Sequence, residues 1–140
     1  MEKPKGGLLN VLVIENEPFF LRLLSQFLTT AGYRVEAAAD AKKGIERFET
    51  SRFDAVVIDL LLGEGTGWEV IEAIRGKDAV VGTILLSAVA EQLNRDVVRA
   101  RGFDLVLDKP VEANTLREAV AEVSRLKAAR LAAIGRDRYK

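Results

Sequence analysis

The sequence of 140 residues contains no cysteine and no histidine. Without cysteine there is neither a disulfide framework nor a thiolate metal site. Without histidine, general-base catalysis by an imidazole and most zinc chemistry are excluded. The functions that remain depend on other polar side chains.

No charge of one sign dominates, because lysine plus arginine and aspartate plus glutamate each number 21. A neutral chain gives no general reason to expect binding to nucleic acid or to an anionic membrane. No apolar run reaches the length of a membrane span. We therefore predict a cytoplasmic protein with no nucleic-acid partner and no membrane partner.

The composition, with 49% apolar and 30% charged residues, is typical of one globular domain of this length. The start, "MEKPKGGLLN", is interpreted as a short flexible leader over residues 1–8 rather than a signal peptide. The domain is predicted over 9–126. Residues 127–140 are predicted to form a basic helical extension or a linker stub, and a solvated helix end explains their cations better than nucleic-acid binding.

Apolar, strand-like runs alternate with amphipathic helical patterns along the chain. Five such pairs predict an α/β fold with a parallel sheet covered by helices on both faces. The first, third and fourth runs are almost wholly apolar and are predicted to be central, whereas the short, mixed second run is predicted at an edge. The runs are Leu9–Ile14, Arg34–Ala37, Ala55–Ile58, Val81–Leu86 and Leu105–Leu107.

Polar residues follow four of these runs directly, and the carboxyl ends of parallel strands meet at one edge of a sheet. Two carboxylates as close as Glu15 and Asp59 would repel each other unless a cation lay between them. An all-oxygen ligand set suits Mg²⁺. With Lys109 and Ser87 at the same edge, the sequence predicts a site for phosphoryl transfer to the Asp59 carboxylate.

Four segments in order carry a resemblance to a known family: "VLVIENEP", "DAVVIDLLLGEGTGWEV", "TILLSA" and "GFDLVLDKPV". Together they resemble the receiver domain of bacterial two-component response regulators, of the chemotaxis-receiver type. The resemblance implies a single (βα)5 doubly wound sheet in the flavodoxin-like strand order 2-1-3-4-5. It also implies a signalling module rather than an enzyme in the ordinary sense.

The resemblance also implies roles for particular residues. Asp59 would accept a phosphoryl group from a sensor histidine kinase or a histidine phosphotransfer protein. Ser87 and Lys109 would contact the phosphoryl oxygens, and the peptide bond before Pro110 would be cis. The expected Mg²⁺ ligands are Glu15, Asn16, Asp59 and the backbone carbonyl of Leu61.

The switch positions implied by the family are Ser87 and Val106. A downstream protein would meet the face formed by the fourth helix, the fifth strand and the fifth helix, and a homodimer is an assembly that the resemblance allows. The apolar Leu61 and Val89 beside the acceptor predict slow autodephosphorylation.

Three positions depart from the usual pattern of the family. Asn16 stands where the metal is usually held by an aspartate, so it offers an oxygen but no charge. Val106 stands where a switching tyrosine or phenylalanine is usual, and Gly63 replaces a common proline. These departures motivate an alternative, in which the chain is a degenerate receiver that binds a partner without phosphorylation.

Two other classes fit less well. A flavodoxin-like cofactor binder needs glycines and backbone N–H groups after the first strand, where this chain has the acidic "ENEP". A hydrolase with a nucleophilic aspartate at that position is disfavoured because the residue is Glu15.

Overall fold

The computed structural model of the protein describes residues 8–138 and contains one sheet of five parallel strands in the order β2-β1-β3-β4-β5. This confirms the predicted fold class and strand order, with β2 at one edge. All of the leader predicted at 1–8 except Leu8 lies outside the described residues. The strands are β1 (Asn10–Ile14), β2 (Arg34–Ala38), β3 (Ala55–Asp59), β4 (Gly82–Ser87) and β5 (Leu105–Asp108).

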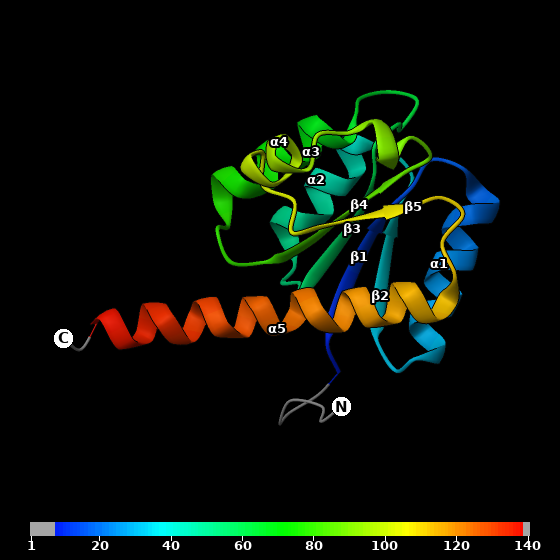
Figure 1. Ribbon diagram of the computed structural model, residues 1–140. Helices are drawn as coiled ribbons and strands as arrows, with labels where there is room; N and C mark the ends of the chain where they lie inside the picture. The colour runs from blue at the N-terminus through cyan, green and yellow to red at the C-terminus, as the bar shows by residue number, and fades with distance from the viewer. Residues whose placement is uncertain (1–7, 139–140) are drawn as a thin grey trace.

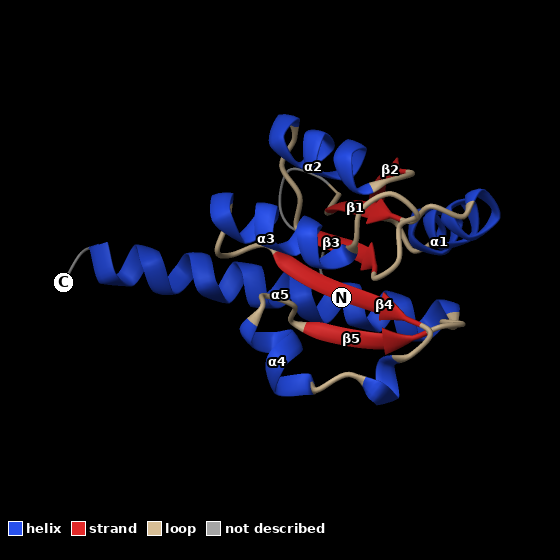
Figure 2. Ribbon diagram, turned by 90° about the horizontal axis from the view of Figure 1, so that it is seen from above, coloured by secondary structure: helices blue, strands red, loops and turns tan. Residues whose placement is uncertain are grey.

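Helices cover both faces of this sheet (Figures 1 and 2). α1 and α5 lie on one face, and α2, α3 and α4 lie on the other. A short 3-10 turn, η1, precedes α4. The helices are α1 (Pro18–Thr30), α2 (Ala41–Thr50), α3 (Gly67–Lys77), η1 (Ala90–Gln92), α4 (Arg95–Ala100) and α5 (Ala113–Arg138). Within residues 8–138, none of them combines the length and apolarity needed to cross a membrane.

The interior strands supply both halves of the core because successive side chains of a strand point to opposite faces. In β1, Val11 and Val13 pack in the cluster beneath α1 and α5. Leu12 and Ile14 pack in the cluster beneath the helices of the other face. All four side chains are fully buried. A strand buried on both sides must be apolar throughout, which is why the acidic Glu15 comes only where β1 ends.

The starts of the helices follow from side chains that cap them. At α1, the Glu17 carboxylate accepts hydrogen bonds from the N–H groups of Phe19 (3.1 Å) and Phe20 (2.7 Å), with Pro18 at the first helical position. At α2, Asp40 accepts from the Lys43 N–H at 2.8 Å. These caps fix the direction in which each helix leaves the carboxyl edge of the sheet.

The segment before β5 differs from the sequence-based expectation of one helix from about Glu91 to Arg101. The structure instead has the separate turn η1, and α4 starts only at Arg95. The turn ends at Leu93, whose backbone is extended, and the side chain of Asn94 then accepts from the N–H groups of Asp96 and Val97. A cap in the middle of a helical pattern starts a new helix there.

α5 is 26 residues long, or about 39 Å at a rise of about 1.5 Å per residue, and it projects past the sheet (Figure 1). Two of its cations, from the predicted basic extension, are tied to the amino-terminal edge of the sheet. Lys127 donates to the Phe53 carbonyl at 2.7 Å. Arg130 donates to Asp104 and to the Val80 carbonyl.

Asp104 is the centre of this second polar cluster. Its carboxylate also accepts from Arg75 of α3 at 3.3 Å and from the Thr83 N–H at 3.0 Å. Its side chain is only 10% exposed, and that of Arg75 is 18% exposed. The cluster therefore joins α3, β4, β5 and α5 at the edge opposite the predicted site.

Replacing the shared carboxylate, Asp104→Ala, is expected to lower the free energy of unfolding by about 3 kcal/mol, because it leaves two partly buried guanidinium groups without their counter-charge. Urea unfolding measures this. The matched control, Glu36→Ala, removes the exposed bridge to Arg47 and is expected to cost about 0.2–1 kcal/mol. Equal losses of unfolding free energy in the two variants would show that the Asp104 cluster contributes no more to stability than an exposed salt bridge.

Candidate functional site

The predicted side chains converge at the carboxyl edge of the sheet around a hollow of about 290 Å³. Glu15 follows β1, Asp59 ends β3, Ser87 ends β4 and Lys109 follows β5. The order of the strands brings these four segments together although they span 94 positions of the chain. The other residues that line the hollow are Asn16, Glu17, Leu60, Leu61, Gly63, Ala88 and Val89.

The Lys109 ammonium joins the two buried carboxylates. Its Nζ atom donates to Asp59 Oδ2 at 2.8 Å and to Glu15 Oε2 at 3.1 Å. Glu15 is 1% exposed and Asp59 is 4% exposed, whereas the Lys109 side chain is 18% exposed. Hydrogen bonds between ionised groups are strong where water is excluded, so these three side chains form the fixed centre of the site.

Two carboxylates and one ammonium leave this centre short of positive charge. Burial, followed by the hydrogen bond and the charge of Asp59, raises the pKa of Glu15 from 4.5 to about 7. Burial lowers the pKa of Lys109, but its hydrogen bonds to Asp59 and Glu15 and their charges outweigh burial, so the pKa of Lys109 is raised. The site therefore favours binding of a proton or another cation.

The Lys109 side chain has a further neighbour, because its Nζ atom lies 4.7 Å from the centre of the Phe20 ring. Its backbone N–H donates to the Ser87 carbonyl at 3.0 Å. The Lys109–Pro110 peptide bond is cis, as the resemblance implied. Backbone and side-chain contacts together define where the ammonium lies.

Ser87 lies at the end of β4 and is 1% exposed. Its Oγ atom accepts a hydrogen bond from the Val89 N–H at 3.0 Å. The hydroxyl hydrogen is not used by that contact, so Ser87 retains a donor at the rim of the hollow that it lines.

The loop after β3 closes the other side of the hollow. The Asp59 Oδ1 atom accepts from the Leu61 N–H at 3.4 Å. At Gly67, the first residue of α3, an added Cβ would lie 2.8 Å from the Asp59 carbonyl oxygen, which is too close for any other residue. Gly63 has a φ of +73°, a conformation that favours glycine, and Asn16 Nδ2 lies 3.2 Å from where its Cβ would be.

The comparisons with known proteins decide the family. The sequence profile of the response regulator receiver domain matches residues 11–121. The chain belongs to this family. The resemblance noted in the sequence is thereby confirmed, and the site described above occupies the carboxyl edge of a receiver domain of the two-component response regulators.

Among curated relatives, the acid tolerance regulatory protein ActR of Sinorhizobium medicae (strain WSM419) is 33% identical over 116 residues, which are 81% of this chain and 58% of ActR. The receiver domain thus spans about half the length of the curated relatives it matches. Among solved structures, a CheY-like receiver domain of Methanospirillum hungatei JF-1 superposes with a TM-score of 0.82 at 25% identity, covering 89% of this chain and 99% of that chain.

The receiver domain of the sensor histidine kinase PA1611 from Pseudomonas aeruginosa PAO1 is similar too. It has a TM-score of 0.77 at 26% identity and covers 84% of this chain and 98% of its own. That structure has a magnesium ion coordinated in its active-site cleft.

Two residues singled out in the sequence lie outside the hollow of the receiver domain. Val106 is half-buried in β5 and packs against the core cluster beneath α2, α3 and α4. Its carbonyl accepts from Arg95 of α4 at 3.3 Å. Trp68 packs edge-on against Phe103 and carries the Arg101 guanidinium over its ring at 4.5 Å, so it has a packing role.

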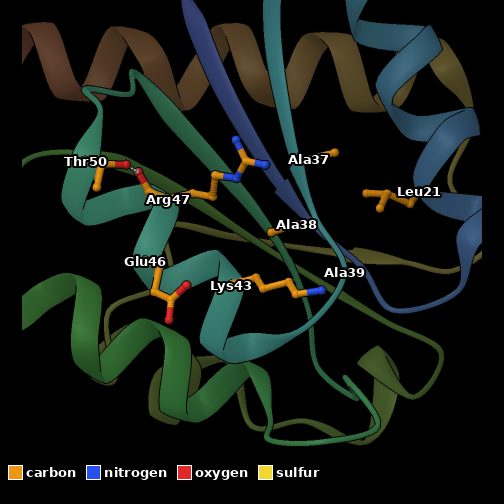
Figure 3. A pocket seen from close by; sticks show the side chains of 8 residues that line it. All are labelled: Leu21, Ala37, Ala38, Ala39, Lys43, Glu46, Arg47 and Thr50. Carbon is orange, nitrogen blue, oxygen red and sulfur yellow. Dashed lines mark hydrogen bonds between the residues drawn. The ribbon is translucent and has the colours of Figure 1, made fainter.

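A larger hollow of about 560 Å³ lies at the β2 edge of the receiver domain, between α1 and α2 (Figure 3). It contains none of the predicted site residues. Three consecutive alanines form its floor, and Figure 3 shows Lys43 and Arg47 reaching toward the strand from α2. Its lining is Leu21, Ala37, Ala38, Ala39, Lys43, Glu46, Arg47 and Thr50, and these mixed charges select no ligand chemistry.

Phe20 is the site neighbour that the sequence analysis missed. It belongs to the apolar repeat of α1, which by itself indicates only packing against the core. The available signal was its place in the first turn of the helix, three residues after Glu17, where a side chain still lies beside the ends of the strands.

The charge deficit of the site predicts how stability depends on pH. Because the pKa of Glu15 is about 7 when folded, above its ordinary 4.5, its contribution is present below about pH 4.5 and is lost as pH rises through 7. Without metal, Glu15→Gln is expected to raise the free energy of unfolding by up to about 3 kcal/mol at about pH 8, and by much less at about pH 5.

Urea unfolding with a chelator at the two pH values checks this expectation. Glu118→Gln, an exposed carboxyl of α5, is the control and should stay within about 0.5 kcal/mol of the parent protein at both. A Glu15→Gln protein that is less stable than the parent at the higher pH would show that the carboxylates do not repel.

Proposed function

We propose that this receiver domain accepts a phosphoryl group on Asp59 within a two-component phosphorelay. The observation that carries the proposal is the buried Asp59 carboxylate, which contacts the Lys109 ammonium at 2.8 Å and opens onto a hollow lined by Ser87 and Asn16. A carboxylate buried beside a cation needs a reason for being there, and nucleophilic transfer chemistry supplies one.

The reaction is transfer from a phosphohistidine donor. A carboxylate oxygen of Asp59 attacks phosphorus, a new P–O bond forms, and the P–N bond to the donor imidazole breaks with its electron pair going to nitrogen. Lys109 is placed to neutralise charge on the phosphoryl oxygens, and the Ser87 hydroxyl is placed to donate a hydrogen bond to one of them.

The donor set fits Mg²⁺. Carboxylate oxygens of Glu15 and Asp59, the amide oxygen of Asn16 and the backbone carbonyl of Leu61 would be hard oxygen ligands, and the two buried carboxylates share only one ammonium, that of Lys109. When bound, the ion would offset negative charge on the phosphoryl oxygens. The magnesium in the PA1611 receiver domain supports this assignment.

Two exposed apolar side chains flank the entrance, Leu61 at 70% and Val89 at 42% exposure. Neither side chain can hydrogen-bond and orient a water molecule for attack on an aspartyl phosphate. A long-lived phosphorylated form is therefore the expected state, which suits a relay or a sustained signal.

The partners follow from the same role. A sensor histidine kinase or a histidine phosphotransfer protein would supply the phosphoryl group. A downstream protein would bind the face formed by α4, β5 and α5. Ser87 and Val106 would couple phosphorylation of Asp59 to that face. Val106 has no aromatic ring that could change orientation on phosphorylation, unlike the tyrosine or phenylalanine usual at this position.

An alternative function has one observation in its favour. Asn16 leaves the site with two carboxylates, and among residues 8–138 no group of three or more His, Cys, Asp or Glu is placed to hold a metal. A site with too few carboxylates to hold a metal would be expected in a degenerate receiver, which binds its partner without being phosphorylated.

Labelling with acetyl phosphate in millimolar Mg²⁺ separates the two functions. The parent protein is expected to gain the mass of one phosphoryl group because Asp59 is the nucleophile, and Asp59→Asn is expected to gain none. Intact-mass spectrometry measures both. The control, Asp108→Asn, changes an exposed acid next to Lys109 and should label normally. A parent protein that takes no label would favour the degenerate receiver.

Restoring a charge at the metal position is expected to tighten Mg²⁺ binding. Asn16→Asp should lower the dissociation constant by tenfold or more, since unit charges about 4 Å apart interact by about 4 kcal/mol at an effective dielectric of about 20 and tenfold requires only about 1.4 kcal/mol. Titration calorimetry measures it. Equal or weaker affinity would exclude Asn16 as a ligand.

A further inference from the structure

We propose that Phe20 is a positioning residue for Lys109, holding the ammonium over its ring while the other partners of the ammonium change during phosphoryl transfer. This inference rests on the proposed function and adds a residue to it. The observation is the Lys109 Nζ atom 4.7 Å from the centre of the Phe20 ring. An ammonium within about 6 Å of an aromatic face is attracted by the ring quadrupole.

The two carboxylate partners cannot hold Lys109 unchanged through the reaction. Asp59, now 2.8 Å from the ammonium, becomes an acyl phosphate and loses its charge to the phosphoryl oxygens. Glu15, now at 3.1 Å, is the proposed ligand of a cation that competes for its oxygens. The Phe20 ring takes part in neither change, so it is a contact that can persist from the free protein to the phosphorylated one.

The sequence fixes Phe20 where this contact requires it. Its backbone N–H donates to the Glu17 carboxylate at 2.7 Å as part of the α1 cap. Its ring is half-buried and packs against the cluster beneath α1 and α5. A side chain held at both its backbone and its ring is a rigid platform, and rigid support of a reacting group is what transfer chemistry needs.

The departure at Asn16 increases the importance of the ring. An aspartate there would be a third carboxylate able to attract the Lys109 ammonium, whereas the neutral amide exerts no such pull. With two carboxylates remaining, attraction to an aromatic face forms a larger share of what retains the cation in the hollow.

The experiment compares Phe20→Leu, which removes the ring and keeps apolar packing, with Phe20→Tyr, which keeps an aromatic face. The matched control is Phe27→Leu, which removes a half-buried ring from the same helix and the same core cluster about 10 Å further along α1. Thermal unfolding of all three variants reports any general loss of packing.

Two readouts distinguish positioning from structure. In the NMR spectrum, the Lys109 ε-methylene protons should be shifted upfield by the ring in the parent protein and in Phe20→Tyr, and this shift should vanish in Phe20→Leu. The rate of Asp59 labelling by acetyl phosphate should fall about two- to fivefold in Phe20→Leu. It should stay near the parent rate in Phe20→Tyr and in Phe27→Leu.

The outcomes separate this inference from the proposed function. A labelled parent protein with equal rates in Phe20→Leu and Phe20→Tyr would overturn the positioning role alone, as would an unshifted methylene signal in the parent. Slowed labelling in Phe27→Leu equal to that in Phe20→Leu would also overturn it. A parent protein that takes no label would contradict the proposed function, and the positioning role with it.

Discussion

The repulsion between two buried carboxylates, Glu15 and Asp59, is the constraint on which the rest of the site depends. Burial raises the cost of their charges, and only a cation within a few ångströms offsets it. The chain meets this need with Lys109, which comes from the far side of β4 and joins both acids. The sheet order brings Lys109 to this edge, its backbone N–H donates to the Ser87 carbonyl, and its ammonium lies over the ring of Phe20.

The neutral side chain of Asn16 has opposite consequences for the stability of the metal-free protein and for the affinity of the site for a cation. A third carboxylate would add repulsion to a hollow that already has more negative than positive charge, so the amide makes the folded protein less dependent on a bound cation. At the proposed metal site, the same amide would weaken the attraction for Mg²⁺, because it offers an oxygen without a charge. Under the proposed function, the chain would thus exchange metal affinity for stability in the absence of metal.

Much of the fold and the location of the site could be predicted from the sequence, because both depend on local patterns. Wholly apolar runs such as Ala55–Ile58 identify interior strands, and the polar residues that follow them identify the carboxyl edge. The cap that Asp40 forms at the start of α2 could also be predicted, because a helix cap depends on local sequence. The break at Asn94 was not predicted, because a continuous helical pattern and an interrupted one share the same apolar positions.

Contacts between segments far apart in the chain could not be predicted from the sequence. Phe20 looks like any apolar residue of α1 until the fold brings Lys109 over its ring. Arg130 was interpreted as part of a solvated helix end, yet it meets Arg75 of α3 at Asp104. Such contacts produce no periodic pattern of residues in the sequence, because each depends on how two separate elements pack in the fold.

Both edges of the sheet carry carboxylates and cations, but the two edges differ in how completely the protein itself pairs these charges. At the amino-terminal edge, Arg75 and Arg130 share the carboxylate of Asp104, and Lys127 pairs with Asp54. Backbone carbonyls take the remaining guanidinium hydrogens there, including those of Gly102, Val80 and Val81. Every charge has a partner supplied by the protein, so this edge is fixed.

At the carboxyl edge, the buried carboxylates of Glu15 and Asp59 share the one ammonium of Lys109, and within the part of the chain that the structure describes no second cation lines the hollow. Backbone N–H groups can be donors to a carboxylate, as Glu17 is to Glu15 at 3.1 Å, but they carry no full charge. The remaining deficit must be met from solution, by a proton or by a metal ion. A site that is complete only when a cation arrives suits the proposed phosphoryl transfer, whereas the opposite edge has its charges paired within the protein and holds α5 against the sheet.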